Sequence, residues 1–377
     1  MHRIAFRPST FARLALLVAL LLASAALVSA APDMAYKLSS SGPLPIGGDV
    51  NDFQISANGV YTVYRAGQDV SDIYQLYAVR TDGSQAAVRV SAAPDQGRYI
   101  REYAISPDNA HVVYTIDQDT RNVIELYSAR LDGGGSPVKL NGPMVEGGGL
   151  TIYSGGFKIS PDGGRVVYRA DQDTDEVQEL YSAPIDGGAP AVKLNAPLPT
   201  GAGVYGYAIS PDSQYAVYTS DQDTDNVVEL YRVPLDGSGG PQKLNGALVA
   251  GGSVTSFKFS PDSNWVLYLA DQDTNDVVEL YAVPLSGGAP VKLNGTLAAD
   301  GDVGFGGTFD VSPDSQRVIY LADQDTNDTD ELYSVPIGGG SAPVKLNPPL
   351  PAGGDVSWVW HAQISSDSSR VVYLADQ

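Results

Sequence analysis

The chain has 377 residues, a formal net charge of −21 at pH 7 and no cysteine. The lack of cysteine excludes disulfides and a lipid anchor on a cysteine. The negative charge opposes binding to nucleic acid or anionic lipid, and it suits cations, basic partners or simple solubility.

The first 30 residues have the layout of a secretory signal peptide. Arg3, Arg7 and Arg13 accompany an almost wholly apolar run over residues 14–27, and small residues at 28–30 offer a cleavage point. An uncleaved membrane anchor is the alternative, but a spanning helix needs about 20 apolar residues and this run is shorter. We therefore predict export to the periplasm, cell surface or extracellular space, with no membrane insertion after cleavage.

An internal repeat organises the rest of the chain. The tetrapeptide Asp-Gln-Asp-Thr begins at Asp117, Asp171, Asp221, Asp271 and Asp323, at intervals of 50 to 54 residues. A fixed period of this length is typical of propellers, solenoids and other repeat architectures. The sequence therefore predicts one repeat domain over residues 31–377.

Each repeat is predicted to hold four short strands, here called a to d. In one copy they cover residues 157–160, 165–169, 179–183 and 190–194. A Ser-Pro-Asp turn joins strands a and b, the acidic tetrapeptide joins b and c, and an Asp-Gly-Gly turn joins c and d. Because no segment has sustained helical periodicity, four-stranded units repeated in this way predict an all-β propeller.

The motifs resemble those of the TolB-like, WD40-like propeller repeat. The resemblance rests on Ser-Pro-Asp-Gly, a Val-Val-Tyr strand, the acidic turn, Glu-Leu-Tyr and Asp-Gly-Gly, and it covers nearly all of residues 31–377. It implies a fold but no single function, since such repeats serve many roles. TolB carries an additional α/β domain and propeller-bearing serine peptidases carry a hydrolase domain, and the sequence predicts neither.

The strand count predicts seven blades. Strand d occurs first at residues 36–39, before any strand a. The seventh blade is therefore predicted to combine this N-terminal strand d with C-terminal strands a and b, and to lack only strand c. By the repeat, the C-terminus is about 15 residues short of a full unit, with a three-stranded closing blade as the alternative. The seven copies of strand a lie near Phe53, Tyr103, Phe157, Tyr207, Phe257, Phe309 and Ala362.

Binding residues are predicted on the face that carries the acidic b–c loops and the Gly/Pro-rich d–a linkers, because loops on a rigid scaffold often carry function. Tyrosines that recur in each copy, such as Tyr181, are predicted to pack between blades. Large residues that vary between copies lie ahead of strand a, at the channel mouth, where they suit a peptide or a glycan; packing under the linkers is the alternative. They are Tyr99, Arg101, Tyr153, Tyr205, Phe305, Trp358, Trp360 and His361.

The acidic loops suggest a calcium site, since residues 221–229 place oxygen donors at positions 1, 3, 5 and 9. No copy has glycine at position 6, where Asn226, Asp276 and Asp328 are expected to be left-handed instead. The alternative is that these carboxylates cap their own hairpins. The predicted ligands are Asp171, Asp173, Asp175, Glu179, Asp221, Asp223, Asp225, Glu229, Asp271, Asp273, Asn275, Glu279, Asp323, Asp325, Asn327 and Glu331.

The sequence favours binding over catalysis. Residues 31–377 contain two histidines, His111 and His361, and no nucleophile elbow, phosphate loop or zinc helix motif. The leading interpretation is an exported scaffold that binds a protein or an envelope polysaccharide. Two alternatives stay open: a calcium-dependent hydrolase or lyase acting in the channel, and a structural surface module of a longer protein.

Overall fold

The computed structural model describes residues 37–39, 44, 48–70, 73–92, 98–151, 156–304, 309–351, 353–356 and 362–376. These residues form six four-stranded antiparallel sheets and one two-stranded sheet, each built from consecutive strands. The predicted all-β architecture with seven successive blades is therefore confirmed. The described part of the chain contains no helix of the length and apolar character that crossing a membrane requires.

The first three blades follow one another from the N-terminus. The first blade has strands β1 (Val50–Ile55), β2 (Tyr61–Ala66), β3 (Gln75–Arg80) and β4 (Val88–Arg89). The second has β5 (Tyr103–Ile105), β6 (His111–Ile116), β7 (Glu125–Arg130) and β8 (Val138–Lys139). The third has β9 (Phe157–Ile159), β10 (Arg165–Ala170), β11 (Glu179–Pro184) and β12 (Val192–Lys193).

The remaining blades repeat this order. The fourth has β13 (Val204–Ile209), β14 (Tyr215–Ser220), β15 (Glu229–Pro234) and β16 (Gln242–Lys243). The fifth has β17 (Val254–Phe259), β18 (Trp265–Ala270), β19 (Glu279–Pro284) and β20 (Val291–Lys292). The sixth has β21 (Phe309–Val311), β22 (Arg317–Ala322), β23 (Glu331–Pro336) and β24 (Val344–Lys345), and the seventh has β25 (Gln363–Ile364) and β26 (Val371–Val372).

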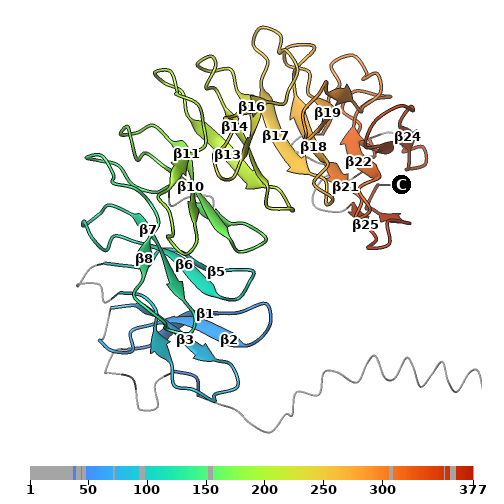
Figure 1. Cartoon of the computed structure of the whole chain (residues 1–377). Helices are drawn as coiled ribbons and strands as arrows, with labels where there is room; N and C mark the ends of the chain where they lie inside the picture. The colour runs from blue at the N-terminus through green and yellow to red at the C-terminus, as the bar shows by residue number, and fades with distance from the viewer. Residues whose placement is uncertain are drawn as a thin grey trace, which may run out of the picture.

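The blades follow an arc, with strand a of each blade toward the centre and strand d toward the outside (Figure 1). The arc is open between the first blade and the seventh in this view. Within the described part of the chain, the first and last blades therefore each have one face that no neighbouring blade covers.

Aromatic pairs and apolar clusters between blades form the core. In the fourth blade Tyr218 of β14 lies opposite Tyr231 of β15, and their stacked rings are 5.5 Å apart. Both rings pack against Val167, Leu180 and Leu194 of the third blade. Burying one side chain of this size contributes about 1.5–3 kcal/mol, so each blade is stabilised mainly by its neighbours. The prediction that the recurring tyrosines pack between blades is confirmed.

The Ser-Pro-Asp turn has a structural role that explains its recurrence. The backbone N–H of Tyr215 donates to Ser210 Oγ, and Ser210 Oγ donates to Asp212 Oδ1 at 2.6 Å. The Asp212 N–H then donates to Ser263 Oγ in the next blade at 3.0 Å. Ser263 has φ 61°, as the tight turn requires. The a–b turns thus connect neighbouring blades along one face.

The two ends of the domain contain the parts of the predicted closing blade. Among the described residues β26 pairs only with β25, and residues 37–39 belong to no strand. Leu38 nevertheless packs on Tyr64 and Tyr77 of the first blade, as Leu194 packs on the tyrosines of the fourth. Leu38 thus has the contacts of a strand d leucine from a preceding blade. Tyr36 and residues 1–30 lie outside the described residues, so ring closure and the signal peptide stay predictions.

Candidate functional site

The first Asp of the acidic motif caps the loop in which it lies. Asp221 Oδ1 accepts the N–H of Gly203 at 2.8 Å, and Oδ2 accepts the N–H of Asn226 at 3.0 Å. Burial acts to raise the pKa of Asp221, but these bonds and the Tyr205 hydroxyl outweigh burial and lower the pKa. Asn226 has φ 64°, which confirms the predicted left-handed position 6. Asp276 and Asp328 have φ 60° and 57°, as predicted.

The second Asp and the Glu of the motif hold a lysine from strand d. Lys243 Nζ lies 2.8 Å from Asp223 Oδ2 and 2.7 Å from Glu229 Oε2. The Tyr231 hydroxyl donates to the same glutamate at 3.0 Å. Burial acts to lower the pKa of Lys243, but the bonds to the two carboxylates outweigh burial and raise it. We call this arrangement the lysine clamp; it recurs at Lys139, Lys193, Lys243, Lys292 and Lys345.

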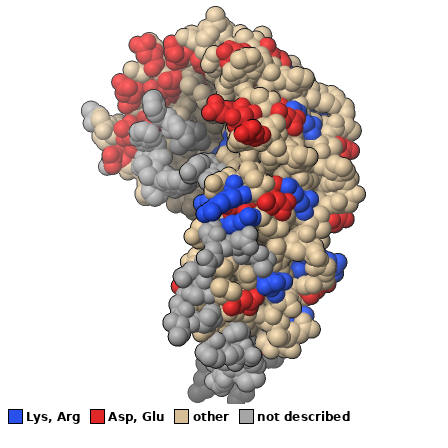
Figure 2. Space-filling view, turned by 90° about the vertical axis from the view of Figure 1, so that its left-hand side faces the viewer, with Lys and Arg blue, Asp and Glu red and all other residues tan. Residues whose placement is uncertain are grey.

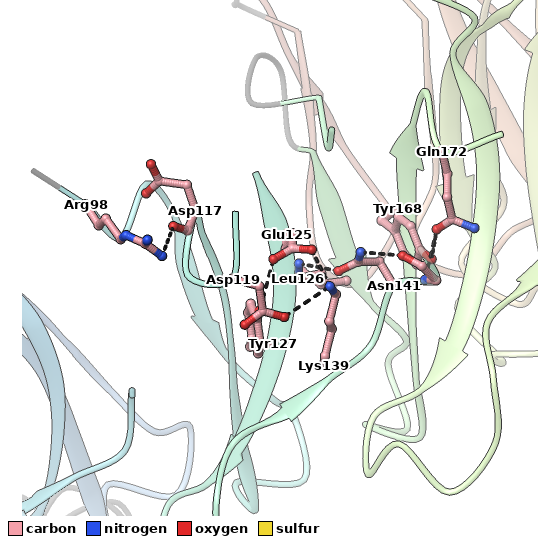
Figure 3. Close-up of polar contacts among 11 residues, drawn as sticks. Arg98, Asp117, Asp119, Glu125, Leu126, Tyr127, Lys139, Asn141, Tyr168 and Gln172 are labelled. Atoms are coloured by element: carbon pink, nitrogen blue, oxygen red, sulfur yellow. Dashed lines mark hydrogen bonds and ion pairs between the residues drawn. The ribbon is translucent and has the colours of Figure 1, made fainter. Parts of the chain in front are cut away.

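The remaining repeated polar residues of the fourth blade also have internal partners. Gln222 Oε1 accepts the hydroxyl of Tyr218 at 2.9 Å, and Asn245 Oδ1 accepts the N–H of Leu230 at 2.8 Å. Figure 3 shows the corresponding contacts around the second and third blades, where Lys139 lies between Asp119 and Glu125. The polar residues that define the repeat therefore mostly bind one another; in the second blade the Tyr114 hydroxyl and Gln118 Oε1 have no hydrogen-bond partner among the described residues.

This geometry bears on the calcium hypothesis. Position 1 of the loop caps backbone N–H groups, and positions 3 and 9 share a lysine ammonium. Position 5 lies over the linker, since a Cβ on Gly201 would lie 3.0 Å from Asp225 Oδ1. Within the described ranges, no group of three or more His, Asp or Glu side chains is placed to hold a metal. In this conformation the carboxylates cap the hairpin and bind the lysine. Calcium binding stays a prediction, and it requires the lysine to move away from Asp223 and Glu229.

The strongest candidate for a binding surface is a set of β-bulges at the start of strand a. The register of β1, β13 and β17 shifts between Val50 and Asp52, between Val204 and Gly206, and between Val254 and Ser256. A bulge turns the extra residue away from the regular pleat. The bulged residues are Asn51, Tyr205 and Thr255, and all three are exposed.

Two further blades have a side chain at the same place, and the sixth blade has Gly304 there. Arg101 follows the buried Ile100, and Thr151 follows the buried Leu150, just as Tyr205 follows the buried Val204. Each residue lies where a d–a linker enters the innermost strand, so all of them are at one mouth of the channel. We call Asn51, Arg101, Thr151, Tyr205 and Thr255 the bulge ring.

The predicted binding residues are only partly described. Arg101 and Tyr205 belong to the bulge ring, and Tyr99 beside Arg101 is 47% exposed. Asn51, Thr151 and Thr255 were missed because they are small, although their offset from the buried apolar residue was a usable signal. The predicted residues Tyr153, Phe305, Trp358, Trp360 and His361 lie outside the described residues.

Arginine and lysine side chains of the preceding blade donate hydrogen bonds to backbone carbonyls in or near the bulge ring. Arg65 Nη1 donates to the carbonyl of Ile100 at 2.7 Å, and Arg169 Nη1 donates to the carbonyl of Val204 at 3.2 Å. Lys158 Nζ donates to the carbonyl of Tyr207 at 2.8 Å. Burial, followed by the charge of Arg169, lowers the pKa of Lys158. Basic side chains on strands a and b of the first and third blades therefore contact strand a of the next blade or the residue just before it, although the chain as a whole is acidic.

Acidic and basic side chains are also distributed unevenly over the surface. In Figure 2 acidic side chains dominate the upper part of the view, and most of the lysine and arginine side chains lie in the lower half. The first blades are at the bottom of both views. A partner that approaches the face seen in Figure 2 therefore meets a mixed surface rather than a uniformly negative one.

Comparison with known proteins supports the fold. No family model and no curated protein matches the chain. The structure is similar to that of dipeptidyl peptidase 4 of Porphyromonas gingivalis, with a TM-score of 0.59 and 11% identity over 89% of this chain and 50% of that one. The fold is a β-propeller. The likeness concerns the fold alone, and the chain spans half of that enzyme's length.

Two other solved structures are similar over parts of the propeller. One is a protein assigned as TolB from Agrobacterium tumefaciens, with 20% identity, a TM-score of 0.36, and coverage of 65% of this chain and 80% of that one. The other is an oligogalacturonate lyase in complex with manganese, with 14% identity, a TM-score of 0.44, and coverage of 88% and 90%.

A cluster of carboxylates in the sixth blade of the propeller predicts a pH-dependent stability. Burial and the charges of Asp323 and Asp355 raise the pKa of Asp330 to about 6. Since the folded state holds this proton more tightly than the unfolded state, stability should fall as the pH rises from about 4 to 6. Asp330→Asn removes the charge and should stabilise the protein by about 1 kcal/mol at pH 7.5, after discounting for solvent screening.

The measurement is urea unfolding of Asp330→Asn and the parent at pH 7.5 and 4.5. The gain should be smaller at pH 4.5, where the parent already holds the proton. Glu146→Gln, which neutralises an exposed linker carboxylate, is the control and should give little gain at either pH. An equal gain for Asp330→Asn at both values would contradict the pKa argument.

Proposed function

We propose that the protein is an exported, non-enzymatic propeller scaffold that binds a protein or an envelope polysaccharide through the bulge ring and the adjoining linkers. One observation carries the proposal: the residues repeated in each blade bind one another, whereas the residues of the bulge ring vary between blades and four of the five are exposed. Variation at exposed positions on a rigid, repeated scaffold is the arrangement expected of a recognition surface.

The ring is organised before any partner arrives. Tyr205 is 49% exposed, yet its hydroxyl donates to Asp221 at 2.8 Å and its carbonyl accepts from Arg169. An aromatic side chain held in this way loses little conformational entropy on binding, which favours affinity. Tyrosine and arginine are also the side chains that most often dominate binding energies at interfaces.

Export is part of the proposal and rests on the signal layout of residues 1–30. An exported protein meets peptides and glycans of the envelope rather than cytoplasmic nucleotides or nucleic acid. The acidic surface agrees with this, since it repels polyanions.

The test is a screen with two kinds of probe, a glycan array and a displayed peptide library. Probes that bind the parent are then titrated calorimetrically against Arg101→Ala combined with Tyr205→Ala. We expect at least about a tenfold loss of affinity, because the variant removes two side chains of the kind that dominate interfaces. The thermal midpoint should change little, since both residues are exposed.

The matched control is Arg130→Ala, on the opposite face. The Arg130 side chain is 58% exposed and, among the described residues, forms an ion pair only with exposed Asp132. The Arg130→Ala variant should bind the probe as the parent does. Equal binding of a probe to the parent, the double variant and Arg130→Ala would show that recognition lies elsewhere and would overturn the proposal. The class of probe that binds, peptide or glycan, identifies the partner as protein or polysaccharide.

A further inference from the structure

The junction between the first and second blades contains an arginine with its own carboxylate. Arg65 of β2 reaches the second blade, where its Nη1 donates to the carbonyl of Ile100 at 2.7 Å. Its Nη2 forms an ion pair with Asp52, which lies opposite Arg65 on β1. Asp52 Oδ1 also accepts the hydroxyl of Tyr103 at 2.9 Å. On the same strand, Gln54 Nε2 donates to the carbonyl of Tyr103 at 3.0 Å.

The junction between the third and fourth blades repeats this arrangement without the carboxylate. Arg169 of β10 occupies the place of Arg65, and its Nη1 donates to the carbonyl of Val204 at 3.2 Å. The backbone N–H of Arg169 donates to the carbonyl of Gly156 at 3.1 Å. Glycine therefore stands opposite Arg169, where the first blade has Asp52 opposite its arginine.

A second cation lies beside Arg169. Lys158 of β9 occupies the place of Gln54, and its Nζ donates to the carbonyl of Tyr207 at 2.8 Å and lies 4.9 Å from the centre of the Tyr207 ring. Lys158 lies opposite Val167, two residues from Arg169. Because side chains alternate along a strand, both cations are on the face of the sheet that packs on the fourth blade.

Neither cation has a carboxylate partner among the described residues. Lys158 and Arg169 bind only backbone carbonyls and the Tyr207 ring, and Arg169 Nη2 has no hydrogen-bond partner. Glu102 is close enough for its carboxylate to bond to the backbone of Gly156, but it forms no ion pair with Arg169. Burial raises the pKa of Glu102, whereas an ion pair with an arginine would lower it.

The junction between the fifth and sixth blades has a carboxylate again. Lys258 occupies the place of Lys158, donates to the carbonyl of Phe309 at 2.6 Å and lies 3.7 Å from Asp310 Oδ1. The chain as a whole has 44 acidic residues for 23 basic ones, so carboxylates are plentiful. Two adjacent cations without one therefore mark a place for an anion that comes from outside the chain.

We propose that the junction between the third and fourth blades binds the carboxylate group of a ligand. Its oxygens would accept hydrogen bonds from Arg169 Nη2 and Lys158 Nζ, as Asp52 accepts them from Arg65. Such charge-assisted bonds are stronger than those between neutral groups. The two blades lie in the middle of the arc (Figure 1), so the site does not depend on how the ends of the domain meet. It uses none of the side chains of the bulge ring.

The first probe is acetate. Titration of acetate with the full chain should broaden its NMR signal with a Kd on the order of 1–10 mM, because so small a ligand makes few contacts. Acetate should also raise the thermal midpoint above that in chloride at equal ionic strength, since it binds the folded state. The second probe is N-acetylaspartate amide. If it binds more tightly than acetate, the carboxylate belongs to an acidic side chain of a partner; if more weakly, to a small free acid.

The repeat itself supplies the variants. Lys158→Ala combined with Arg169→Thr recreates the pair that the second blade has at this place, Ala104 and Thr115, and should therefore fold. The double variant should bind acetate at least about tenfold more weakly. Lys258→Ala is the matched control: it removes the equivalent lysine of the fifth blade, which has its own carboxylate, and should bind acetate as the parent does.

A further variant should create a second site. Asp52→Gly removes the carboxylate from Arg65 and reproduces the glycine of the third blade, so acetate should raise its thermal midpoint more than that of the parent. The proposal is overturned if acetate stabilises the parent no more than chloride does, or if the double variant binds acetate as well as the parent. It is also overturned if acetate binds only to Glu102→Gln, because Glu102 would then occupy the place itself.

Discussion

Phe157→Ala should destabilise the protein by about 3–5 kcal/mol, whereas Phe53→Ala should cost less than about 1 kcal/mol. The two residues occupy the same place in strand a of the third and first blades. Phe157 packs against Val113 and Leu126 of the preceding blade, so its removal leaves a cavity. Phe53 is 64% exposed because none of the described blades packs on this side of the first blade in the open arc, so its removal leaves no cavity.

Urea unfolding of the two variants and the parent provides the measurement. Each substitution removes the same atoms from the same strand position, so each is the matched control of the other. Equal costs would show that Phe53 is buried against the seventh blade in solution and that the ring closes.

The fold could be predicted from the sequence because its signal is repeated. One blade with a weak strand pattern would be ambiguous, but several copies of Ser-Pro-Asp, Asp-Gln-Asp-Thr and Glu-Leu-Tyr at one period leave few architectures. The exposure of Phe53 could not be predicted in this way. Its local sequence resembles that of Phe157, and the difference arises only from which blade is its neighbour in space.

The acidic loops show a second limit of sequence reasoning. Carboxylates at alternating positions suit a calcium ion and an ammonium group equally well, since both are cations that need several oxygens. The lysine of the clamp comes from another strand, so spacing within the loop did not reveal it. A usable signal was nevertheless present, because a Lys-Leu-Asn tripeptide follows each Glu-Leu-Tyr at nearly constant distance.

Lys243→Met should destabilise the protein by about 2 kcal/mol. The substitution leaves the Glu229 carboxylate, whose side chain is 9% exposed, without its cation. Breaking a buried pair from one side typically costs about 3–5 kcal/mol, and the 37% exposure of the Lys243 side chain reduces that figure. Arg130→Met is the control: it breaks a pair exposed on both sides and should cost less than about 0.5 kcal/mol.

The double variant Lys243→Met with Glu229→Gln tests the reason for the loss. If the cost comes from an uncompensated carboxylate, removing that charge should restore part of the stability, although the Tyr231 hydroxyl keeps an acceptor in the amide. A double variant whose loss equals the sum of the two single losses would show that the residues act independently. The lysine clamp would then be a packing contact rather than an ion pair.

The same variants decide which cation the loops hold. Calcium would compete with the Lys243 ammonium for Asp223 and Glu229, so a loop that binds calcium should respond more strongly once the lysine is gone. Thermal unfolding with calcium and with a chelator should then show a larger difference for Lys243→Met than for the parent, because binding to the folded state alone raises its stability. Asp221→Ala with Asp223→Ala should remove the contribution of this loop. If calcium changes the thermal midpoint of neither the parent nor Lys243→Met, the carboxylates of the loop bind the lysine ammonium and not calcium.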